Sequence, residues 1–188
     1  DTADSAAILA REWQCPVVPK IVSPTVLHKT DVGGVIVNVR GETAVRDAFR
    51  QVMQAASDAQ GAIVQEFIAG GHEALIGLTR DAQFGHLVTF GLGGVLVELL
   101  NDVACRLHPL TDRDADEMLS SLRTSPILTG YRNRPGADIP ALRETLLRVS
   151  QLATIVPEIA EMDLNPVIAL PPPLGVRVVD ARIRLAHS

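Results

Sequence analysis

The order of helix-like and strand-like patterns constrains the fold of this chain more than any other sequence feature. Residues 42–59 carry an apolar side chain every three or four positions, which is typical of a helix with one buried face. Residues 2–13 show the same spacing, Thr111 begins a capping-box pattern, and Asp138 is a suitable N-cap for a further helix. Apolar or alternating stretches predict strands over residues 17–22, 35–38, 63–68, 74–79, 86–90, 95–100, 163–168 and 176–181. This order predicts an α+β chain with two lobes that meet near residue 70.

Composition excludes several classes of function. The chain has 188 residues, a net charge of −5 and 3% aromatic residues, so it offers neither a broad basic surface nor a platform for stacking nucleic-acid bases. The most apolar run, residues 92–100, is too short to span a bilayer. Cys15 and Cys105 lie too far apart in the sequence to suggest a zinc site or a disulfide framework. We therefore expect a cytoplasmic protein that binds neither nucleic acid nor membranes.

Lys20 is a candidate binding residue because it lies in the apolar stretch 17–22. An ammonium group in such a strand must reach water, a carboxylate or a ligand phosphate, since burying it unpaired is costly. A strand-edge lysine that extends into solvent is the alternative. The glycine-rich segment 91–94 could also approach a phosphate closely through its backbone, although a tight turn between strands explains it equally well.

A second candidate site combines Glu161, Asp163 and Asn165 with Asp180. The first three alternate with apolar residues, so they should share one face of a strand, and Asp180 ends a predicted strand that could lie beside it. Carboxylate and amide oxygens suit Mg²⁺ that carries a nucleotide phosphate. A solvated polar strand face is the alternative interpretation.

His28 lies in a polar loop that ends in two glycines, next to Lys29 and Asp31. An exposed imidazole can act as a nucleophile toward phosphorus, and a nearby lysine would stabilise the added negative charge. A loop histidine without a chemical role is the alternative.

Several segments, taken in order and spacing, make the chain resemble the ATP-grasp (beta-subunit) domain of ADP-forming acyl-CoA synthetases, which are relatives of succinyl-CoA synthetase. These segments are residues 16–24, 27–35, 64–67, 90–94, 161–166 and 179–183. The resemblance implies an ATP-grasp fold in which two α+β lobes, residues 1–70 and 71–188, enclose a nucleotide cleft. It also implies that the first lobe is truncated at its start. Pro19 departs from the family, which usually has an aliphatic residue before its lysine.

The resemblance assigns nucleotide-binding roles to four residues. Lys20 matches the lysine that contacts nucleotide phosphates. Glu66 and Phe67 match the segment between the lobes whose backbone binds adenine, and Glu73 matches the acidic residue that meets the ribose.

The resemblance also assigns metal-binding and catalytic roles. Asn165 and Asp180 match the magnesium ligands. Asp163 matches a carboxylate near the phosphohistidine, and His28 matches a loop histidine that takes part in phosphate relay in the ADP-forming acetyl-CoA synthetases.

The activity implied by the resemblance is that of an ADP-forming acid–CoA ligase, a ligase that transfers phosphate between ATP or ADP and a phosphohistidine during acyl-CoA formation. ATP or ADP and Mg²⁺ are the implied cofactors. CoA-binding and ligase domains, or a subunit of the same enzyme, are the implied partners, and a small carboxylic acid and CoA would be bound through them. The alternative is a regulatory ATP-grasp module, without its own turnover, in a multidomain protein lysine acetyltransferase.

Overall fold

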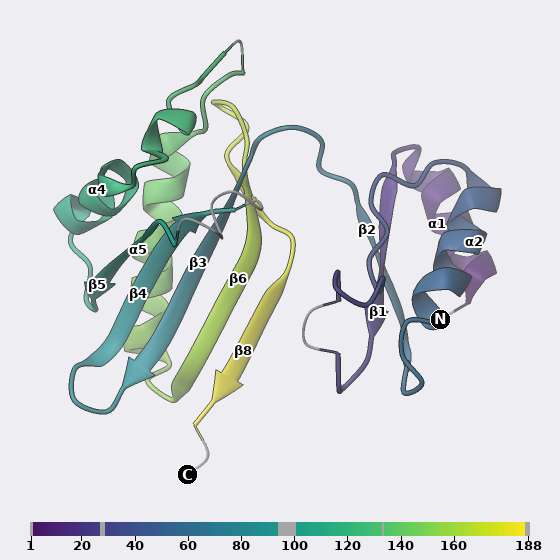
Figure 1. Cartoon of the computed structure of the whole chain (residues 1–188), viewed down its shortest axis with the longest axis horizontal. Coiled ribbons are helices and arrows are strands. Elements are labelled where there is room, and N and C mark those ends of the chain that lie inside the picture. Colours follow the sequence, from purple (N-terminus) through teal and green to yellow (C-terminus); the bar gives the residue numbers. More distant parts are fainter. Residues whose placement is uncertain (1, 27–28, 94–100, 133, 187–188) are drawn as a thin grey trace. The chain divides into compact units, whose positions relative to one another are not determined.

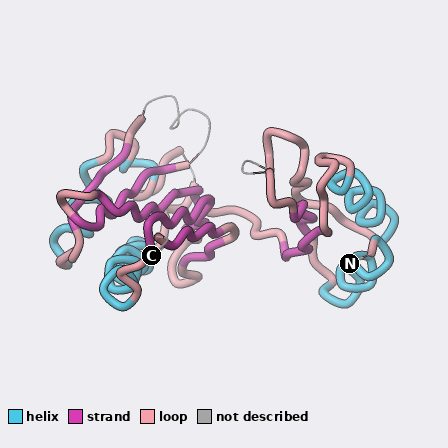
Figure 2. Tube along the Cα trace, turned by 90° about the horizontal axis from the view of Figure 1, so that it is seen from below, coloured by secondary structure: helices cyan, strands magenta, loops and turns pink. Residues whose placement is uncertain are grey.

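The computed structural model describes residues 2–26, 29–93, 101–132 and 134–186. The chain divides into two compact units, Asp1–Ala69 and Gly70–Ser188. Each unit combines helices with antiparallel strands around its own hydrophobic core (Figures 1 and 2). This confirms the predicted α+β class. Among the described residues, no helix is both long enough and apolar enough to cross a membrane.

The first unit contains two helices and a two-stranded antiparallel sheet. Helices α1 (Ala3–Trp13) and α2 (Glu42–Met53) pack against each other, and α2 also packs against strands β1 (Val17–Val22) and β2 (Gly61–Glu66). The core of this unit consists of small, branched and aromatic side chains: Ala6, Ala10, Val17, Val39, Val45, Ala48 and Phe49. The amphipathic spacing seen in the sequence of α2 therefore does correspond to its buried face.

The prediction of a strand over residues 35–38 is wrong. Val35 forms only an isolated bridge with Lys20. Pro19 has no N–H group, so it can accept a hydrogen bond from the Ile36 N–H group but cannot return one. Asn38 then adopts a positive φ of 57°, which ends the extended conformation.

Helix α2 is shorter than the predicted 42–59. It ends at Met53, and the following residues turn back toward β1. Asp58 accepts hydrogen bonds from Ser23 Oγ at 2.7 Å and Thr25 Oγ1 at 2.8 Å. These two hydroxyl groups lower the pKa of the Asp58 carboxyl group, and they fix the loop that follows β1.

The second unit contains a six-stranded antiparallel sheet within the described residues. Its strands follow the order β5-β4-β3-β6-β7, and β8 also pairs with β6. Their bounds are β3 (His72–Asp81), β4 (Gly85–Leu92), β5 (Val103–Leu107), β6 (Ile159–Ala169), β7 (Val176–Val178) and β8 (Ala181–Leu185). The predicted hairpin is confirmed as β3 and β4, which pair from Asp81 and Gly85 outward.

The helices of the second unit begin where the sequence predicted. Thr111 Oγ1 accepts a hydrogen bond from the Asp114 N–H group, and the Asp114 carboxylate accepts one from the Thr111 N–H group, which completes the capping box of α4 (Asp112–Ser121). Asp138 Oδ1 caps α5 (Ile139–Ile155). A short 3₁₀ helix, η1 (Ser125–Ile127), lies between α4 and α5 in the chain.

The C-terminal strands differ from the prediction. The expected strand over residues 176–181 is divided into β7 and β8, and Val179 and Asp180 lie between them. Asp180 therefore precedes β8 instead of ending a strand. Strand β5 was not predicted, and the strand expected over residues 95–100 lies outside the described residues.

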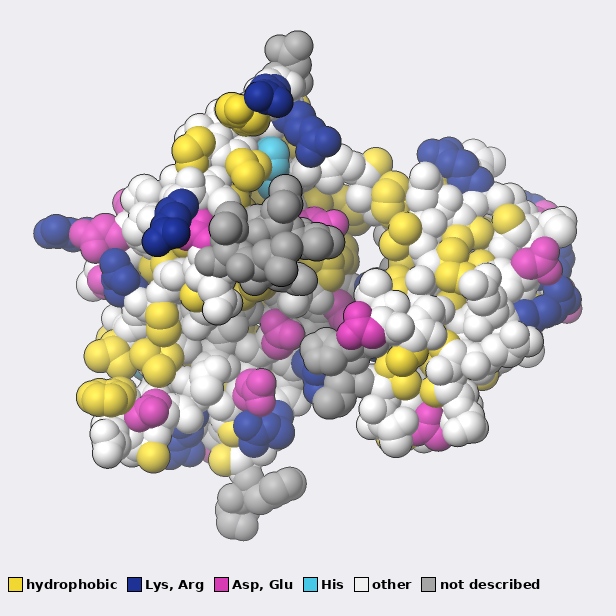
Figure 3. Space-filling view, in the orientation of Figure 1, with side chains coloured by type: hydrophobic (Ala, Val, Ile, Leu, Met, Phe, Trp, Pro, Cys, Tyr) yellow, Lys and Arg dark blue, Asp and Glu magenta, His cyan; other side chains and the backbone are white. Residues whose placement is uncertain are grey.

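The two faces of this sheet differ in their environment. Helices α4 and α5 cover one face, where the core includes Ala74, Ile76, Leu78, Val88, Phe90, Met162 and Leu164. The alternating positions point to the opposite face, which we call the open face. Around β3, β6 and β8 the open face carries polar and charged side chains: Glu73, Thr79, Glu161, Asp163, Asn165, Arg182 and Arg184. Acidic and basic side chains lie close together on the visible surface of the second unit (Figure 3).

Candidate functional site

Lys20 lies in the middle of β1, opposite Ile63 of β2, and only 8% of its surface is exposed. A lysine that simply extended into solvent would be far more exposed, so that alternative is wrong. Gly34 packs against the same strand, and a Cβ atom at this position would lie 2.5 Å from Ile21 Cγ2. The close approach of this loop helps to enclose β1 next to Lys20. Burial makes a charged or hydrogen-bonding partner necessary for the ammonium group.

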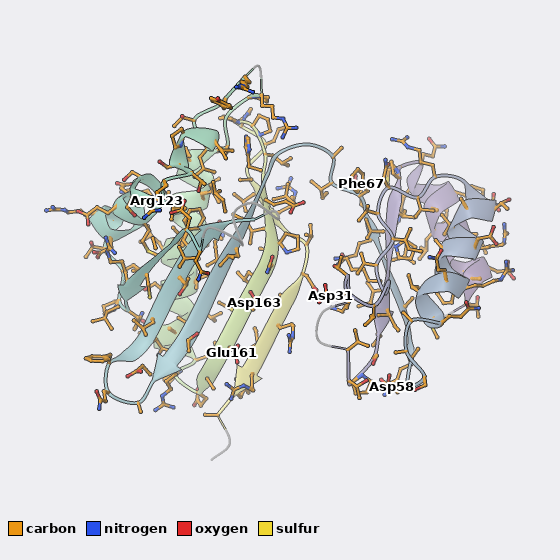
Figure 4. All side chains as sticks on the ribbon, viewed as in Figure 1. Asp31, Asp58, Phe67, Arg123, Glu161 and Asp163 are labelled. Carbon is orange, nitrogen blue, oxygen red and sulfur yellow. The ribbon has the colours of Figure 1, made fainter. Side chains whose placement is uncertain are left out.

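Glu66 and Phe67 lie at the end of β2 in the first unit. Glu66 is exposed, and with Trp13 and Cys15 it lines an open pocket of about 350 Å³. The Phe67 N–H group donates a 2.8 Å hydrogen bond to the Pro16 carbonyl group, which holds the chain beside the start of β1 (Phe67 is labelled in Figure 4). The carboxylate of Glu66 is thus available to a ligand, whereas the backbone N–H group of Phe67 is already bonded.

Glu73 lies near the start of β3 on the open face, and its side chain is exposed. Its carbonyl group accepts a 2.7 Å hydrogen bond from the Gly93 N–H group. A Cβ atom at Gly93 would lie 2.9 Å from Glu73 Cβ, so this approach requires glycine. Gly91 continues strand β4 and makes no turn, while Gly94 lies outside the described residues.

The residues predicted around magnesium do come together in the second unit. The Asn165 N–H group donates a hydrogen bond to the Asp180 carbonyl group at 3.2 Å. In the same antiparallel pair, Asp163 lies directly opposite Arg182. Residues that oppose each other across a pair project from the same face, and so do residues two positions apart along a strand. Asp163, Asn165 and Arg182 therefore share the open face, with Asp180 beside Asn165.

Asn165 and Asp180 carry an amide oxygen and a carboxylate, which are the kinds of ligand that Mg²⁺ prefers. Among the residues described by the structure, no group of three or more His, Cys, Asp or Glu side chains could hold a metal ion. A metal site built from three such side chains is therefore not present in that part of the chain. Mg²⁺ commonly binds through one or two protein oxygens, with water and substrate phosphates as the other ligands. The amide of Asn165 and the carboxylate of Asp180 supply ligands of this kind.

Glu161 belongs to an ion pair instead of the metal-binding set. Its Oε2 atom lies 3.1 Å from Arg184 Nη2, and the two residues oppose each other across β6 and β8. Glu161 and Asp163 both project from β6 (Figure 4). The alternation along β6 was predicted correctly, but the sequence did not indicate that Arg184 neutralises Glu161.

His28 lies outside the described residues. The loop that follows it is closed by a hydrogen bond from the Gly34 N–H group to the Lys29 carbonyl group, at 2.7 Å. Asp31 lies on this loop and is exposed (Figure 4). The role predicted for His28 stays a prediction.

Sequence analysis missed two groups of polar residues in the second unit. Arg182 received no role, because only the register between β6 and β8 reveals that it opposes Asp163. The second group contains a histidine pair at the edge of the core: the rings of His86 and His108 are 6.1 Å apart, and His108 Nδ1 lies 3.0 Å from Ser150 Oγ. Burial, and to a lesser extent the neighbouring His86, lower the pKa of His108.

Comparison with known proteins gives a match along nearly the whole chain. A family model described as an ATP-grasp domain matches residues 1–185. The acetate–CoA ligase (ADP-forming) I subunit beta of Pyrococcus furiosus is 43% identical over 188 residues, which cover 97% of this chain and 80% of that protein. The acetate–CoA ligase (ADP-forming) I of Archaeoglobus fulgidus is 44% identical over 191 residues, which cover 98% of this chain but 27% of that protein. The chain thus spans most of a separate subunit and about a quarter of a longer relative.

The fold of this chain also matches that of a solved structure. Acetyl-coenzyme A synthetase 1 of Ca. Korarchaeum cryptofilum, in complex with coenzyme A, Ca-AMPCP and HgCl⁺, matches with a TM-score of 0.91 and 48% identity. The match covers 98% of this chain and 82% of that chain.

Proposed function

This chain belongs to the ATP-grasp family, and from this premise we propose that it is the nucleotide-binding part of an ADP-forming acid–CoA ligase. The observation that carries the proposal is the 43% identity to a beta subunit of acetate–CoA ligase over 97% of the chain. In this activity, phosphate passes between ATP or ADP and a phosphohistidine during acyl-CoA formation. The units Asp1–Ala69 and Gly70–Ser188 are the proposed counterparts of the two ATP-grasp lobes, with a boundary one residue before the predicted one.

Nucleotide-binding roles are proposed for residues of each unit, taken separately. Lys20 contacts the phosphates. Its burial in β1 supports this role, because a buried ammonium group needs a charged or hydrogen-bonding partner. Glu66 and Phe67 contact adenine through backbone groups other than the Phe67 N–H group, which already donates to the Pro16 carbonyl group. The open pocket beside Glu66 supports that assignment. Glu73 binds the ribose through its exposed carboxylate, next to the close approach of Gly93.

Asn165 and Asp180 would hold Mg²⁺, and their hydrogen-bonded neighbourhood on the open face supports this pairing. The ion would offset the negative charge of the phosphate oxygens. A solved structure of the Korarchaeum synthetase contains Mg-AMPPCP, with a phosphohistidine segment that points towards the nucleotide binding site. Asp163 is the proposed carboxylate near a phosphohistidine, and His28 is the proposed loop histidine of the phosphate relay.

The partners in this proposal are CoA-binding and ligase domains, or a separate subunit of the same enzyme, through which CoA and a small carboxylic acid are bound. The compared relatives differ in the acid they use, since one is named for acetate and another, from Nitrosopumilus maritimus, for 4-hydroxybutyrate. Because both match nearly the whole of this chain, the choice of acid is not expected to depend on it. The relatives described here are ligases, and they lend no support to the acetyltransferase alternative. The cytoplasmic location stays a prediction.

Acyl-CoA formation by the intact enzyme tests the proposal. The enzyme is incubated with ATP, Mg²⁺, CoA and each acid of a small panel, and the nucleotide product is separated by chromatography. We expect acyl-CoA together with ADP for at least one acid. Formation of AMP, or ATP binding without exchange between ATP and ADP, would contradict the proposed ligase activity.

A further inference from the structure

Two arginines on β8 have matching positions, but only Arg184 forms an ion pair among the described residues. Arg182 and Arg184 are two residues apart, both are exposed, and both face β6 in an antiparallel pair. Arg184 Nη2 lies 3.1 Å from Glu161 Oε2, and Arg184 Nε lies 3.3 Å from the same oxygen. Arg182 opposes Asp163 in the register, yet among the described residues its guanidinium group forms no ion pair.

Arg182 lies beside the proposed magnesium ligands, whereas Arg184 lies beside Glu161. Opposed Cα atoms in an antiparallel pair are about 5 Å apart, so Arg182 lies next to Asp163. Asp180 lies two residues earlier and Asn165 two residues beyond Asp163, which places Arg182 beside both proposed magnesium ligands. An arginine next to a magnesium site offers several N–H donors in a planar arrangement that matches phosphate oxygens.

We propose that Arg182 binds the phosphoryl group that the enzyme transfers, at the position where that group meets the magnesium ion. This inference rests on the proposed function. The group that Arg182 binds is a phosphoryl group, and it has two possible sources. One is the terminal phosphate of ATP, and the other is the phosphoryl group on histidine. Arg182 donates hydrogen bonds to its oxygen atoms and exchanges no proton with it.

The chemistry of the transfer explains why a cation is useful at this point. The bond between the terminal phosphorus of ATP and the bridging oxygen breaks, and ADP leaves with the electron pair. A histidine ring nitrogen forms the new N–P bond with its lone pair, while the proton on the other ring nitrogen stays in place. Negative charge on the phosphoryl oxygens persists throughout, and a guanidinium group fixed on a strand can stay hydrogen-bonded to them during the transfer.

Calorimetric titration of the intact enzyme with ATP and with ADP, each in the presence of Mg²⁺, tests this role. Arg182→Gln is compared with Arg184→Gln, a matched control on the same strand and face that is already paired with Glu161. We expect Arg182→Gln to weaken ATP binding about 10- to 100-fold, the effect of losing hydrogen bonds to a charged group, and to leave ADP binding unchanged. Arg182→Lys should restore part of the ATP affinity, since it keeps the charge without the planar donor group.

A second measurement separates the two sources of the phosphoryl group. The yield of acid-labile phosphoenzyme is measured after incubation with ATP labelled in its terminal phosphate. Unchanged ATP affinity with a phosphoenzyme yield at least tenfold lower in Arg182→Gln would assign Arg182 to the phosphoryl group on histidine. Equal behaviour of Arg182→Gln and Arg184→Gln in both measurements, or equal weakening of ATP and ADP binding, would overturn the inference. Failure of the unmodified enzyme to bind ATP would instead overturn the proposed function itself.

Discussion

The two faces of the sheet in the second unit separate stability from binding. The face beneath α4 and α5 consists of fully buried apolar side chains such as Ile76, Leu78 and Phe90. The open face around β6 and β8 presents Asp163, Asn165 and other polar groups. A single strand serves both faces because its side chains alternate. One substitution on β4, or between Glu161 and Asn165 of β6, should therefore affect either unfolding or ligand binding, depending on the face to which its side chain points.

The largest expected effect comes from the buried face. Phe90→Ala removes a side chain with 0% exposure from β4 and should lower the free energy of unfolding by about 3–5 kcal/mol, from lost burial and the cavity left behind. Thr89→Ala, at the neighbouring position on the open face, should cost less than about 1 kcal/mol. Urea unfolding followed by circular dichroism measures both. Equal losses for the two variants would contradict the division between the faces.

A substitution on the edge of the open face should weaken ligand binding and leave the free energy of unfolding nearly unchanged. Asp180→Asn keeps an oxygen atom that can accept the hydrogen bond from the Ala181 N–H group, but it removes the carboxylate charge. We expect ATP binding in the presence of Mg²⁺ to weaken about tenfold or more, and binding without Mg²⁺ to change little. Calorimetric titration with and without Mg²⁺ measures this difference. An unfolding free energy that fell as much as in Phe90→Ala would show that Asp180 is mainly structural.

Lys20 in the first unit sharpens the comparison, because it is buried and yet has a proposed binding role. Lys20→Met keeps most of the side-chain volume and removes the charge. We expect ATP binding to weaken by a similar factor whether or not Mg²⁺ is present, since the lost interaction is with phosphate itself. A loss confined to the titrations with Mg²⁺ would place Lys20 in the same functional group as Asp180. Unchanged affinity in both Lys20→Met and Asp180→Asn would contradict the proposed site.

The sequence predicted the local features of the fold well. Helix α5 and the cap at Thr111 follow from residue types within a few positions of each other, and so does the alternation along β6. These signals are local, so they do not depend on which strands pair. The break at Val179 and Asp180 was missed because the apolar residues on either side suggested one continuous strand.

The site was only partly predictable for the same physical reason. Asn165 and Asp180 could be proposed as neighbours from their residue types and the family resemblance. The pairing of Asp163 with Arg182, and of Glu161 with Arg184, depends on the register between β6 and β8, and a shift of one residue would exchange the faces. Sequence patterns do not determine this register. Strand β5 was missed because only five residues form it and they include Cys105 and Arg106.

The smallest expected effect concerns the histidine pair, which is a polar exception at the edge of the buried face. Burial and the neighbouring His86 lower the pKa of His108, so the folded chain binds a proton at His108 less readily than the unfolded chain does. Its contribution to stability should therefore be complete above the pKa of an unfolded histidine, about 6.5, and should be lost as the pH falls below that value. His108→Gln, which can still bond to Ser150 Oγ, should unfold with a weaker dependence on pH between about 7 and 5. Urea midpoints measured across this range test the sign: a stability that increased on acidification, or an unchanged slope in His108→Gln, would show that His108 is not held neutral by its position beside the core.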